Sequence, residues 1–151
     1  MRLSSNTLSI LTNFSTINPS ILVRPGNVLR TCSVSNDIIA YATVTETFDT
    51  QFAIYDLPKF LRGIKLYNDP DLEFSKNSDY VLIKDGSHTI KYYLTDPELV
   101  LAPENRNLRL PSEDVTFEMR EEYFDKLMKA TNIFGFPDFS VLGANGEIIL
   151  Q

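Results

Sequence analysis

The sequence predicts an α+β fold, and three patterns indicate that class. Apolar residues recur at helical spacing over residues 5–17 and 57–65. Between these two segments, short runs typical of strands are separated by turn-forming residues. Residues 79–93 then show a hairpin pattern, for which we expect a type I′ turn at Asp85-Gly86.

The first half of the chain reads as a helix followed by strands. A serine at position 4 or 5 can accept hydrogen bonds from the free N–H groups of the first helical turn, and Pro19 disfavours helical geometry at Asn18, so the helix ends there. Strands are expected at 20–24, 28–34, 38–45 and 50–55.

The second half begins with a segment of different composition. Residues 96–112 are rich in proline and almost without periodicity, which is typical of a connector between domains. Beyond it we expect a strand at 113–119, a helix at 120–132, and a hairpin over 139–150 that turns at Asn145-Gly146. The two halves share an order of elements, which favours one full unit and the first part of a second copy of its topology. The predicted parts are a first domain at 1–95, a connector at 96–112, and an incomplete second domain at 113–151.

Composition and charge limit the classes of function. The 151 residues hold 14 Lys and Arg against 20 Asp and Glu, a formal charge of -6, which disfavours loose adhesion to nucleic acid or to an anionic membrane. Any nucleic-acid contact therefore requires a local basic patch. The single cysteine, Cys32, leaves no intramolecular disulfide and indicates a reducing compartment. The N-terminus is too polar for a signal peptide, and no apolar run reaches the roughly 20 residues of a membrane span, so we expect no membrane association.

A basic ridge is predicted on the helix that follows Asp56. Lys59, Arg62 and Lys65 recur every third residue, and no acidic residue lies between positions 57 and 67. One interpretation is an ordinary solvated helix face; the other is a surface for an anionic partner, which the absence of mixed charges favours. The apolar side chains that should face the core are Leu57, Phe60, Leu61 and Ile64.

The predicted helix at 120–132 repeats this arrangement with Lys126 and Lys129. Its first turn holds Glu121 and Glu122, which suit the positive end of a helix dipole. If both helices face the same space, their cations form a basic surface on an acidic protein. The residues expected to face the core are Tyr123, Phe124, Leu127 and Met128.

Few residues are arranged for catalysis. His88, the only histidine, follows a hairpin turn without a carboxylate or nucleophile placed to work with it. Cys32 is expected to be a small buried apolar residue. The acids Asp69, Asp71 and Glu73 lack calcium-loop spacing, and no glycine-rich phosphate loop is present. The sequence therefore favours a protein that is not an enzyme and has no cofactor or metal.

The segment "ELVLAP" at 98–103 carries adjacent apolar residues inside the predicted connector. One interpretation is an edge strand that packs on its own domain. The other is an apolar groove for a peptide of a partner protein, because exposed apolar patches with polar borders mark binding sites.

Taken together, these segments resemble the sliding clamps of T-even-type bacteriophages, the DNA polymerase processivity factors. The matching text is "MRLS" at the start, "LTNFSTIN" (11–18), "FAIYDLPKFL" (52–61), "LYNDPDLEFS" (66–75), "VLAPENRNLRLP" (100–111) and, more weakly, "GEIILQ" at the end. The resemblance covers essentially the whole chain, and "NFSTIN" and "AIYDL" are its most distinctive parts.

The resemblance implies a clamp fold in which two domains of like topology carry antiparallel sheets outside and helices inside. Family members form a homotrimeric ring around duplex DNA, bind a DNA polymerase and are loaded by a separate ATPase, in this case in the cytoplasm of an infected bacterial host. The implied phosphate-facing residues are Lys59, Arg62, Lys65, Lys126, Lys129 and Arg2. The implied partner-peptide site comprises Leu99, Val100, Leu101, Pro103, Ile38 and Ile39.

Two expectations remain beside this one. Family members continue past residue 151, so the second domain is expected to be incomplete and ring closure is in question. The alternative function is a phage structural or adaptor protein that uses "ELVLAP" for protein contacts only; a small-molecule enzyme is supported least.

Overall fold

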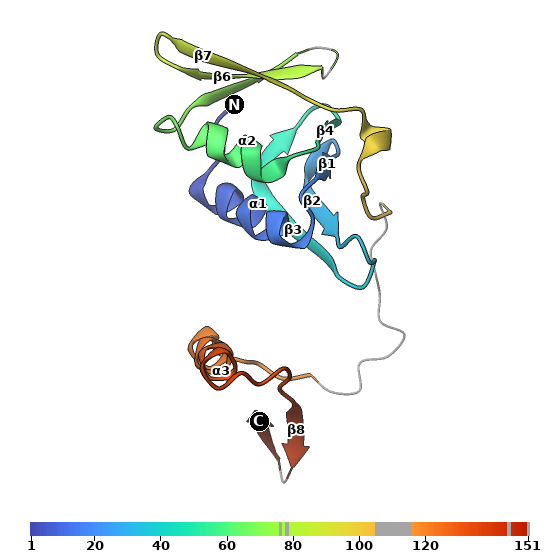
Figure 1. Ribbon diagram of the computed structural model, residues 1–151, viewed down its shortest axis with the longest axis vertical. Helices are drawn as coiled ribbons and strands as arrows, with labels where there is room; N and C mark the ends of the chain where they lie inside the picture. Colours follow the sequence, from blue (N-terminus) through green and yellow to red (C-terminus); the bar gives the residue numbers. More distant parts are fainter. Residues whose placement is uncertain (76, 78, 105–115, 145, 151) are drawn as a thin grey trace. The chain divides into compact units, whose positions relative to one another are not determined.

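The computed structural model describes residues 1–75, 77, 79–104, 116–144 and 146–150, and the chain divides into two compact units, Met1–Asn105 and Arg106–Gln151. It is a mixture of helices and antiparallel strands, as expected (Figure 1). The first unit holds α1 (Ser5–Ile17), β1 (Ile21–Val23), β2 (Gly26–Cys32), β3 (Ile39–Phe48), β4 (Phe52–Ile54), α2 (Leu57–Ile64), β5 (Asp71–Phe74), β6 (Tyr80–Asp85), β7 (His88–Tyr93) and a 3₁₀ turn (Pro97–Leu99).

The strands of the first unit pair antiparallel. β1 pairs with β4, β2 with β3, and β6 lies between β5 and β7. The two helices α1 and α2 contact each other and lie side by side in Figure 1, and α1 also packs on β3. Each helix therefore presents one face to the strands and leaves the opposite face to solvent.

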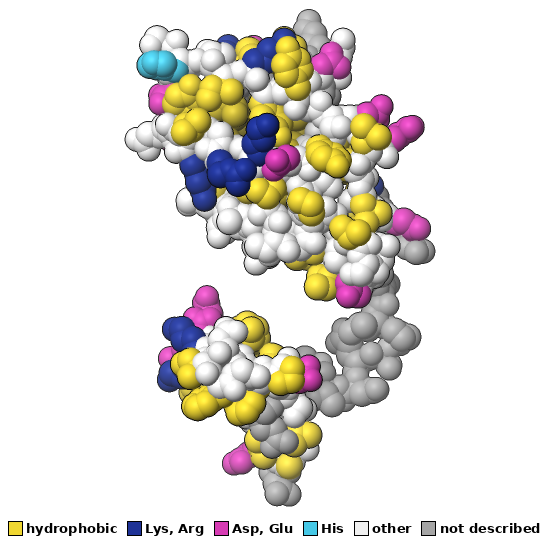
Figure 2. Space-filling model, in the orientation of Figure 1, with side chains coloured by type: hydrophobic (Ala, Val, Ile, Leu, Met, Phe, Trp, Pro, Cys, Tyr) yellow, Lys and Arg dark blue, Asp and Glu magenta, His cyan; other side chains and the backbone are white. Residues whose placement is uncertain are grey.

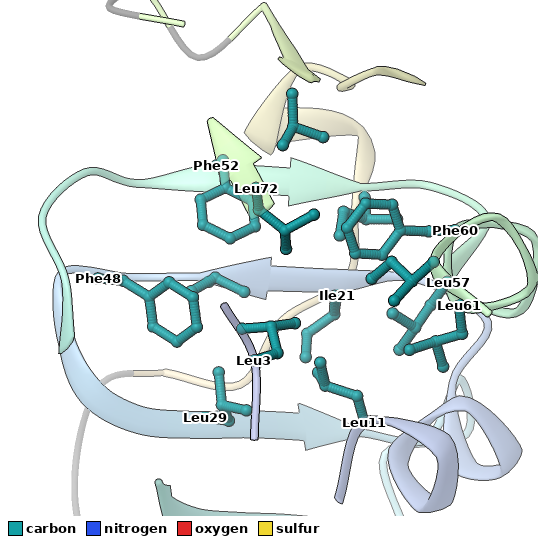
Figure 3. Close-up of a cluster of buried hydrophobic side chains, with 14 of the residues drawn as sticks. Leu3, Leu11, Ile21, Leu29, Phe48, Phe52, Leu57, Phe60, Leu61 and Leu72 are labelled. Carbon is teal, nitrogen blue, oxygen red and sulfur yellow. The ribbon is translucent and has the colours of Figure 1, made fainter. Parts of the chain in front are cut away.

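The hydrophobic core lies between these helices and strands. Figure 3 shows Leu57, Phe60 and Leu61 of α2 pointing toward strand residues such as Ile21, while Leu11 comes from α1. Leu57 is 0% exposed and Phe60 is 2% exposed. The four apolar residues predicted to face the core from α2 are all buried, which confirms the helical spacing read from the sequence.

A carboxylate on β3 fixes the start of α1. Ser4 is the N-cap and its hydroxyl oxygen accepts from the backbone N–H of Thr7, at 3.2 Å. Glu46 in turn accepts hydrogen bonds from the backbone N–H of Ser4 and from the Thr7 hydroxyl. Partial burial raises the pKa of Glu46, but these hydrogen bonds outweigh that effect and lower the pKa to about 2. The negative charge thus stays at the positive end of the α1 dipole.

The three-stranded sheet contains one strand and one turn that differ from the sequence prediction. β5 was not predicted, because two of its four residues are acidic. Its alternation of exposed and buried positions is also too short to be recognised in the sequence. The β6–β7 hairpin is confirmed, but Asp85 pairs with His88, so Gly86 and Ser87 form its loop. Only Gly86 of these has a positive φ, of 56°. Glycine at the first central position is the pattern of a type II′ turn, and the predicted type I′ turn at Asp85-Gly86 is wrong.

The second unit contains α3 (Glu121–Phe134), β8 (Val141–Ala144) and β9 (Glu147–Leu150), with β8 and β9 paired antiparallel. The helix ends at Phe134, two residues later than predicted, and its C-cap Gly135, with a φ of 70°, closes the last turn. The hairpin is confirmed, with Gly146 at φ 80° in its loop; Asn145 lies outside the described residues.

Two predictions for the second unit are wrong for the residues that the structure describes. Thr116–Glu118 and Met119 form no strand, and positions 113–115 of that predicted strand lie outside the described residues. The apolar side chains expected to face a core from α3 are not buried; Tyr123 is 48% exposed and Phe124 is 42% exposed, and Leu127 and Met128 are also incompletely covered. Among the described residues of this unit, one helix and one hairpin supply too few apolar partners to enclose them.

Candidate nucleic-acid interface and partner surface

The helix α2 begins at a well-formed N-cap. An Asp56 carboxylate oxygen accepts from the backbone N–H of Lys59 at 2.8 Å, and Pro58 occupies the first turn, where a missing N–H costs no helical hydrogen bond. The Tyr92 hydroxyl donates to the backbone carbonyl of Asp56 at 3.1 Å, and the Tyr92 ring lies edge-on to Phe60 with centroids 5.1 Å apart. These contacts tie the start of α2 to β7.

With its apolar stripe buried, α2 presents its cations to solvent. Lys59, Arg62 and Lys65 are all exposed. Among the residues that the structure describes, no carboxylate lies within ion-pair distance of any of the three. Figure 2 shows the resulting dark blue cluster over α2. We call Lys59, Arg62 and Lys65 the α2 ridge. Three neighbouring, uncompensated positive charges create a local positive potential on a chain of net charge -6.

Arg2 differs from the α2 ridge because it is already paired. Its guanidinium lies 3.1 Å from a carboxylate oxygen of Asp69 and 3.0 Å from one of Asp71. Hydrogen bonding and charge attraction from Asp71 raise the pKa of Arg2, and the same contact lowers the pKa of the Asp71 carboxyl. The positive charge of Arg2 is therefore offset locally by two acids, for which the sequence indicated no partner.

On α3, Lys126 and Lys129 are exposed, as the sequence analysis expected of a solvent-facing side. The Lys126 ammonium lies 5.9 Å from the centre of the Tyr123 ring, within cation–π range. Glu121 and Glu122 occupy the first turn. The second unit thus carries two exposed lysines on a helix that also holds Glu121, Glu122 and Asp125.

The apolar part of the connector divides into buried and exposed residues. Val100 is 9% exposed, whereas Leu99 is 67% exposed and Leu101 is 41% exposed. Asp96 caps the 3₁₀ turn by accepting from the N–H of Glu98 at 3.0 Å. The described residues of the segment form no edge strand, so the first interpretation of "ELVLAP" is wrong in that respect, although Val100 does pack inward. Pro103 is partly exposed, and positions 105–112 of the predicted connector lie outside the described residues.

A buried asparagine brings the connector to the end of the β2–β3 pair. The Asn18 amide nitrogen donates to the carbonyl of Cys32 at 2.8 Å and to the carbonyl of Leu101 at 3.4 Å. Cys32 is the strand partner of Ile39. The structure therefore brings the backbone of Leu101 close to the strand end that carries Ile38 and Ile39, which are 51% and 44% exposed.

Two further apolar residues at this end of the sheet escaped the sequence analysis. Val34 is 71% exposed in the β2–β3 loop, and Tyr41 is 62% exposed on β3. Tyr41 lies two residues after Ile39 and so on the same strand face, and the Arg30 guanidinium is 5.5 Å from its ring centre. In the sequence, the spacing of Ile39, Tyr41 and Thr43 at every second residue of a predicted strand was the signal that these side chains share one exposed face. We call Val34, Ile38, Ile39, Tyr41, Leu99 and Leu101 the connector patch.

The residues considered for catalysis are not assembled into a site. His88 is exposed and lies beside the Tyr67 ring, with centroids 6.4 Å apart. Cys32 is buried, which raises the pKa of its thiol. Within the described part of the chain, no three His, Cys, Asp or Glu side chains are grouped so as to hold a metal ion. No helix in that part is long and apolar enough to cross a membrane.

Comparison with known proteins gives consistent matches. Residues 4–100 match a family described as DNA polymerase processivity factor. The chain is 31% identical to the sliding clamp of Enterobacteria phage T4 over 152 aligned residues, which cover 100% of this chain and 66% of that protein. It is 31% identical to the sliding clamp of Vibrio phage KVP40, and the alignment covers 93% of this chain and 64% of that protein. It is 28% identical to the sliding clamp of Escherichia phage RB69, and that alignment covers 100% of this chain and 66% of the relative. The chain spans about two thirds of the length of these relatives.

Proposed function

The chain belongs to the DNA polymerase processivity factor family, and on that premise we propose that it is a phage sliding-clamp subunit that surrounds duplex DNA and tethers a replicative DNA polymerase. The observation that carries this proposal is the α2 ridge, in which three exposed cations without an ion-pair partner among the described residues lie together on an acidic protein. A homotrimeric ring, opened by a separate clamp-loader ATPase, is the assembly that the resemblance to phage clamps supports.

In this proposal the α2 ridge contacts phosphate oxygens of DNA. Lys126 and Lys129 of α3 make equivalent contacts from the second domain. Phosphate contacts carry no sequence information, so they allow a clamp to move along any duplex. Arg2 contributes less to DNA binding in this proposal, because its charge is already offset by Asp69 and Asp71. To contact a phosphate, its guanidinium must leave these two carboxylates or contact them and the phosphate together. The excess of acids elsewhere disfavours DNA on other faces of the protein.

The connector patch is the proposed docking site for the polymerase and for the clamp loader. Asn18 holds the backbone of Leu101 in this patch and the backbone of Cys32, the strand partner of Ile39, which limits the entropy lost when a peptide binds. Val100 and Pro103 support the patch from the connector side. Both partners act in DNA replication, so we place the protein in the cytoplasm of the infected host. We propose no catalytic activity for the chain itself.

The adaptor alternative makes a different prediction about charge. A clamp requires its inner cations, whereas an adaptor that uses protein contacts alone is indifferent to them. The family match favours the clamp.

The test is a double charge reversal in the full chain, Arg62→Glu with Lys129→Glu. We expect it to weaken salt-sensitive association with duplex DNA and to reduce loader-dependent stimulation of the cognate polymerase, while urea unfolding stays as in the wild type. The control reverses two lysines of the β6–β7 pair, the exposed Lys91 and the partly exposed Lys84, which pairs with Glu73, as Lys84→Glu with Lys91→Glu; it should leave DNA association unchanged. Equal effects of the two double variants would overturn the assignment of the helices to DNA.

A further inference from the structure

The helix α1 has an exposed face without charge. No Lys, Arg, Asp or Glu occurs between Leu3 and Val23. The exposed side chains of the helix carry only hydroxyl or amide groups, and they are Ser5, Asn6, Ser9, Thr12, Asn13 and Thr16. In an acidic chain with 23% charged residues, an exposed helical face of this kind is a distinctive local composition.

Several hydroxyl groups on this helix already donate a hydrogen bond to a backbone carbonyl of the same helix. The Thr12 hydroxyl donates to the carbonyl of Leu8 at 2.7 Å, and the Thr16 hydroxyl donates to the carbonyl of Asn13 at 2.7 Å. Ser15 does the same toward the carbonyl of Thr12, also at 2.7 Å. A hydroxyl in this arrangement uses its proton within the helix, so Thr12 and Thr16 have none left for a phosphate. The other exposed side chains of this face are neutral donors, which bind a phosphate more weakly than a cation does.

This neutral face adjoins the α2 ridge. α1 and α2 are in contact, and in Figure 2 the dark blue cluster over α2 and the white surface over α1 lie next to each other on one face. The axes of packed helices are about 8–10 Å apart, whereas the major groove alone is roughly 12 Å wide and the whole duplex is wider still. A duplex that rests on the α2 ridge therefore also extends over α1.

We propose that the exposed face of α1 is an uncharged surface over which the DNA backbone passes without being held, so that it limits the number of phosphate contacts each subunit makes. This inference rests on the proposed function and deepens it. Each additional phosphate contact strengthens binding and adds to its salt dependence. A clamp gains retention from topology and loses mobility with every contact that must break, so a neutral helix beside a basic one favours sliding.

The first test adds charge to α1 of the full chain through Thr12→Lys with Thr16→Lys. Lysine has a better helix propensity than threonine, so the fold is retained. The measurement is association with a fluorescent duplex of arbitrary sequence over a series of salt concentrations. We expect tighter binding and a slope of log K against log salt that steepens by up to about 0.9 for each added cation.

The matched control places the same charges on β3, as Thr43→Lys with Thr47→Lys. Both threonines are exposed, whereas Val44 and Phe48 of the same strand are buried in the core, so the control cations lie on the strand face away from the helices. The control should leave the slope as in the wild type. One outcome is that the α1 variant also leaves the slope of log K against log salt unchanged while Arg62→Glu lowers that slope. In that case DNA does not pass over α1, so the inference is overturned and the proposed function stands.

The second test removes the hydroxyls through Thr12→Val with Thr16→Val, which keeps the side-chain shape. Unchanged DNA affinity is expected, because those protons are used within the helix. A loss of affinity would show that the hydroxyls hold phosphates and would also overturn the inference. If the wild-type chain shows no salt-sensitive association with DNA, the proposed function itself fails, and this inference fails with it.

Discussion

The carboxylate of Glu46 on β3 accepts a hydrogen bond from the backbone N–H of Ser4, the N-cap of α1 and 42 positions earlier in the chain. The Thr7 hydroxyl donates to the same carboxylate. This contact joins the start of the neutral helix to the strand beneath it, and through α1 it supports α2, which packs alongside. A single acid in the sheet therefore anchors the helix against which α2 packs.

Replacing that acid should loosen α1. We expect Glu46→Gln to lower the free energy of unfolding by about 1–3 kcal/mol, because a charged acceptor is exchanged for a neutral one at the positive end of a helix. Urea unfolding followed by circular dichroism measures the change. The control is Glu73→Gln, which removes an exposed ion pair with Lys84 and should cost less than about 1 kcal/mol. Equal losses in the two variants would contradict the special role of Glu46.

The same contact predicts a pH dependence. The pKa of Glu46 in the folded state is lowered to about 2, below its ordinary value of 4.5. A lowered pKa means that the stabilisation is complete above pH 4.5 and is lost as the pH falls toward 2. The stability difference between the wild type and Glu46→Gln should therefore shrink over that interval, as measured by urea titrations at several pH values. A difference that stays constant from pH 5 down to pH 2 would exclude this mechanism.

The buried amide of Asn18 should be among the costliest polar side chains to remove. Its nitrogen donates to Cys32 and Leu101, and its oxygen accepts from the backbone N–H of Ser20 at 2.9 Å. Asn18→Leu leaves buried backbone groups without partners, at a cost of about 1–3 kcal/mol. Thermal unfolding measures it, with Asn13→Leu on the exposed face of α1 as the control. No difference between the two would mean that water or a rearranged backbone replaces the amide.

The pairing of Arg2 with two acids separates it from the α2 ridge. Arg62→Gln should reduce the slope of log K against log salt for duplex binding by about 0.9, the value of one phosphate contact. Arg2→Gln should reduce it by less, because that guanidinium is already engaged by Asp69 and Asp71. Salt titrations of both variants measure this ordering. A larger effect at Arg2 would mean that DNA displaces the two acids.

The connector patch should be separable from both stability and DNA binding. Leu99→Asp with Leu101→Asp puts charge at side chains that are 67% and 41% exposed, so folding should be little affected. Binding to the cognate polymerase, measured without DNA, should be lost, since an apolar contact is replaced by buried charge. Leu66→Asp, at a leucine that is 72% exposed, is the control and should bind the polymerase normally. Retained binding in the double variant would move the docking site elsewhere.

Much of the first unit is predictable because its signals are local. The Ser4 cap and the residue pair Asn18-Pro19 set the ends of α1, and Asp56 with Pro58 starts α2. The spacing of Leu57, Phe60, Leu61 and Ile64 decides which side of α2 is buried, and therefore that the cations face solvent. These properties depend on residues within one or two turns of each other, so the sequence by itself determines them.

Other features required the tertiary structure because the residues involved lie far apart in the chain. Arg2 reads as a free cation until the chain brings Asp69 and Asp71 beside it. The apolar stripe of α3 reads as a core face, yet Tyr123 and Phe124 stay 48% and 42% exposed among the residues that the structure describes. The local sequence around Gly86 permits either of two hairpin turns, and the pairing of β6 with β7 selects the one observed.

The sequence alone thus determined that α2 carries a basic ridge, that α1 carries none, and that the whole chain is clamp-like. Only the tertiary structure decided which cations keep their charge uncompensated among the described residues, and that the neutral face of α1 lies directly beside the α2 ridge. The physical reason is that helix formation and amphipathicity are local in the chain, whereas charge compensation and the juxtaposition of surfaces depend on residues that meet only when the chain folds.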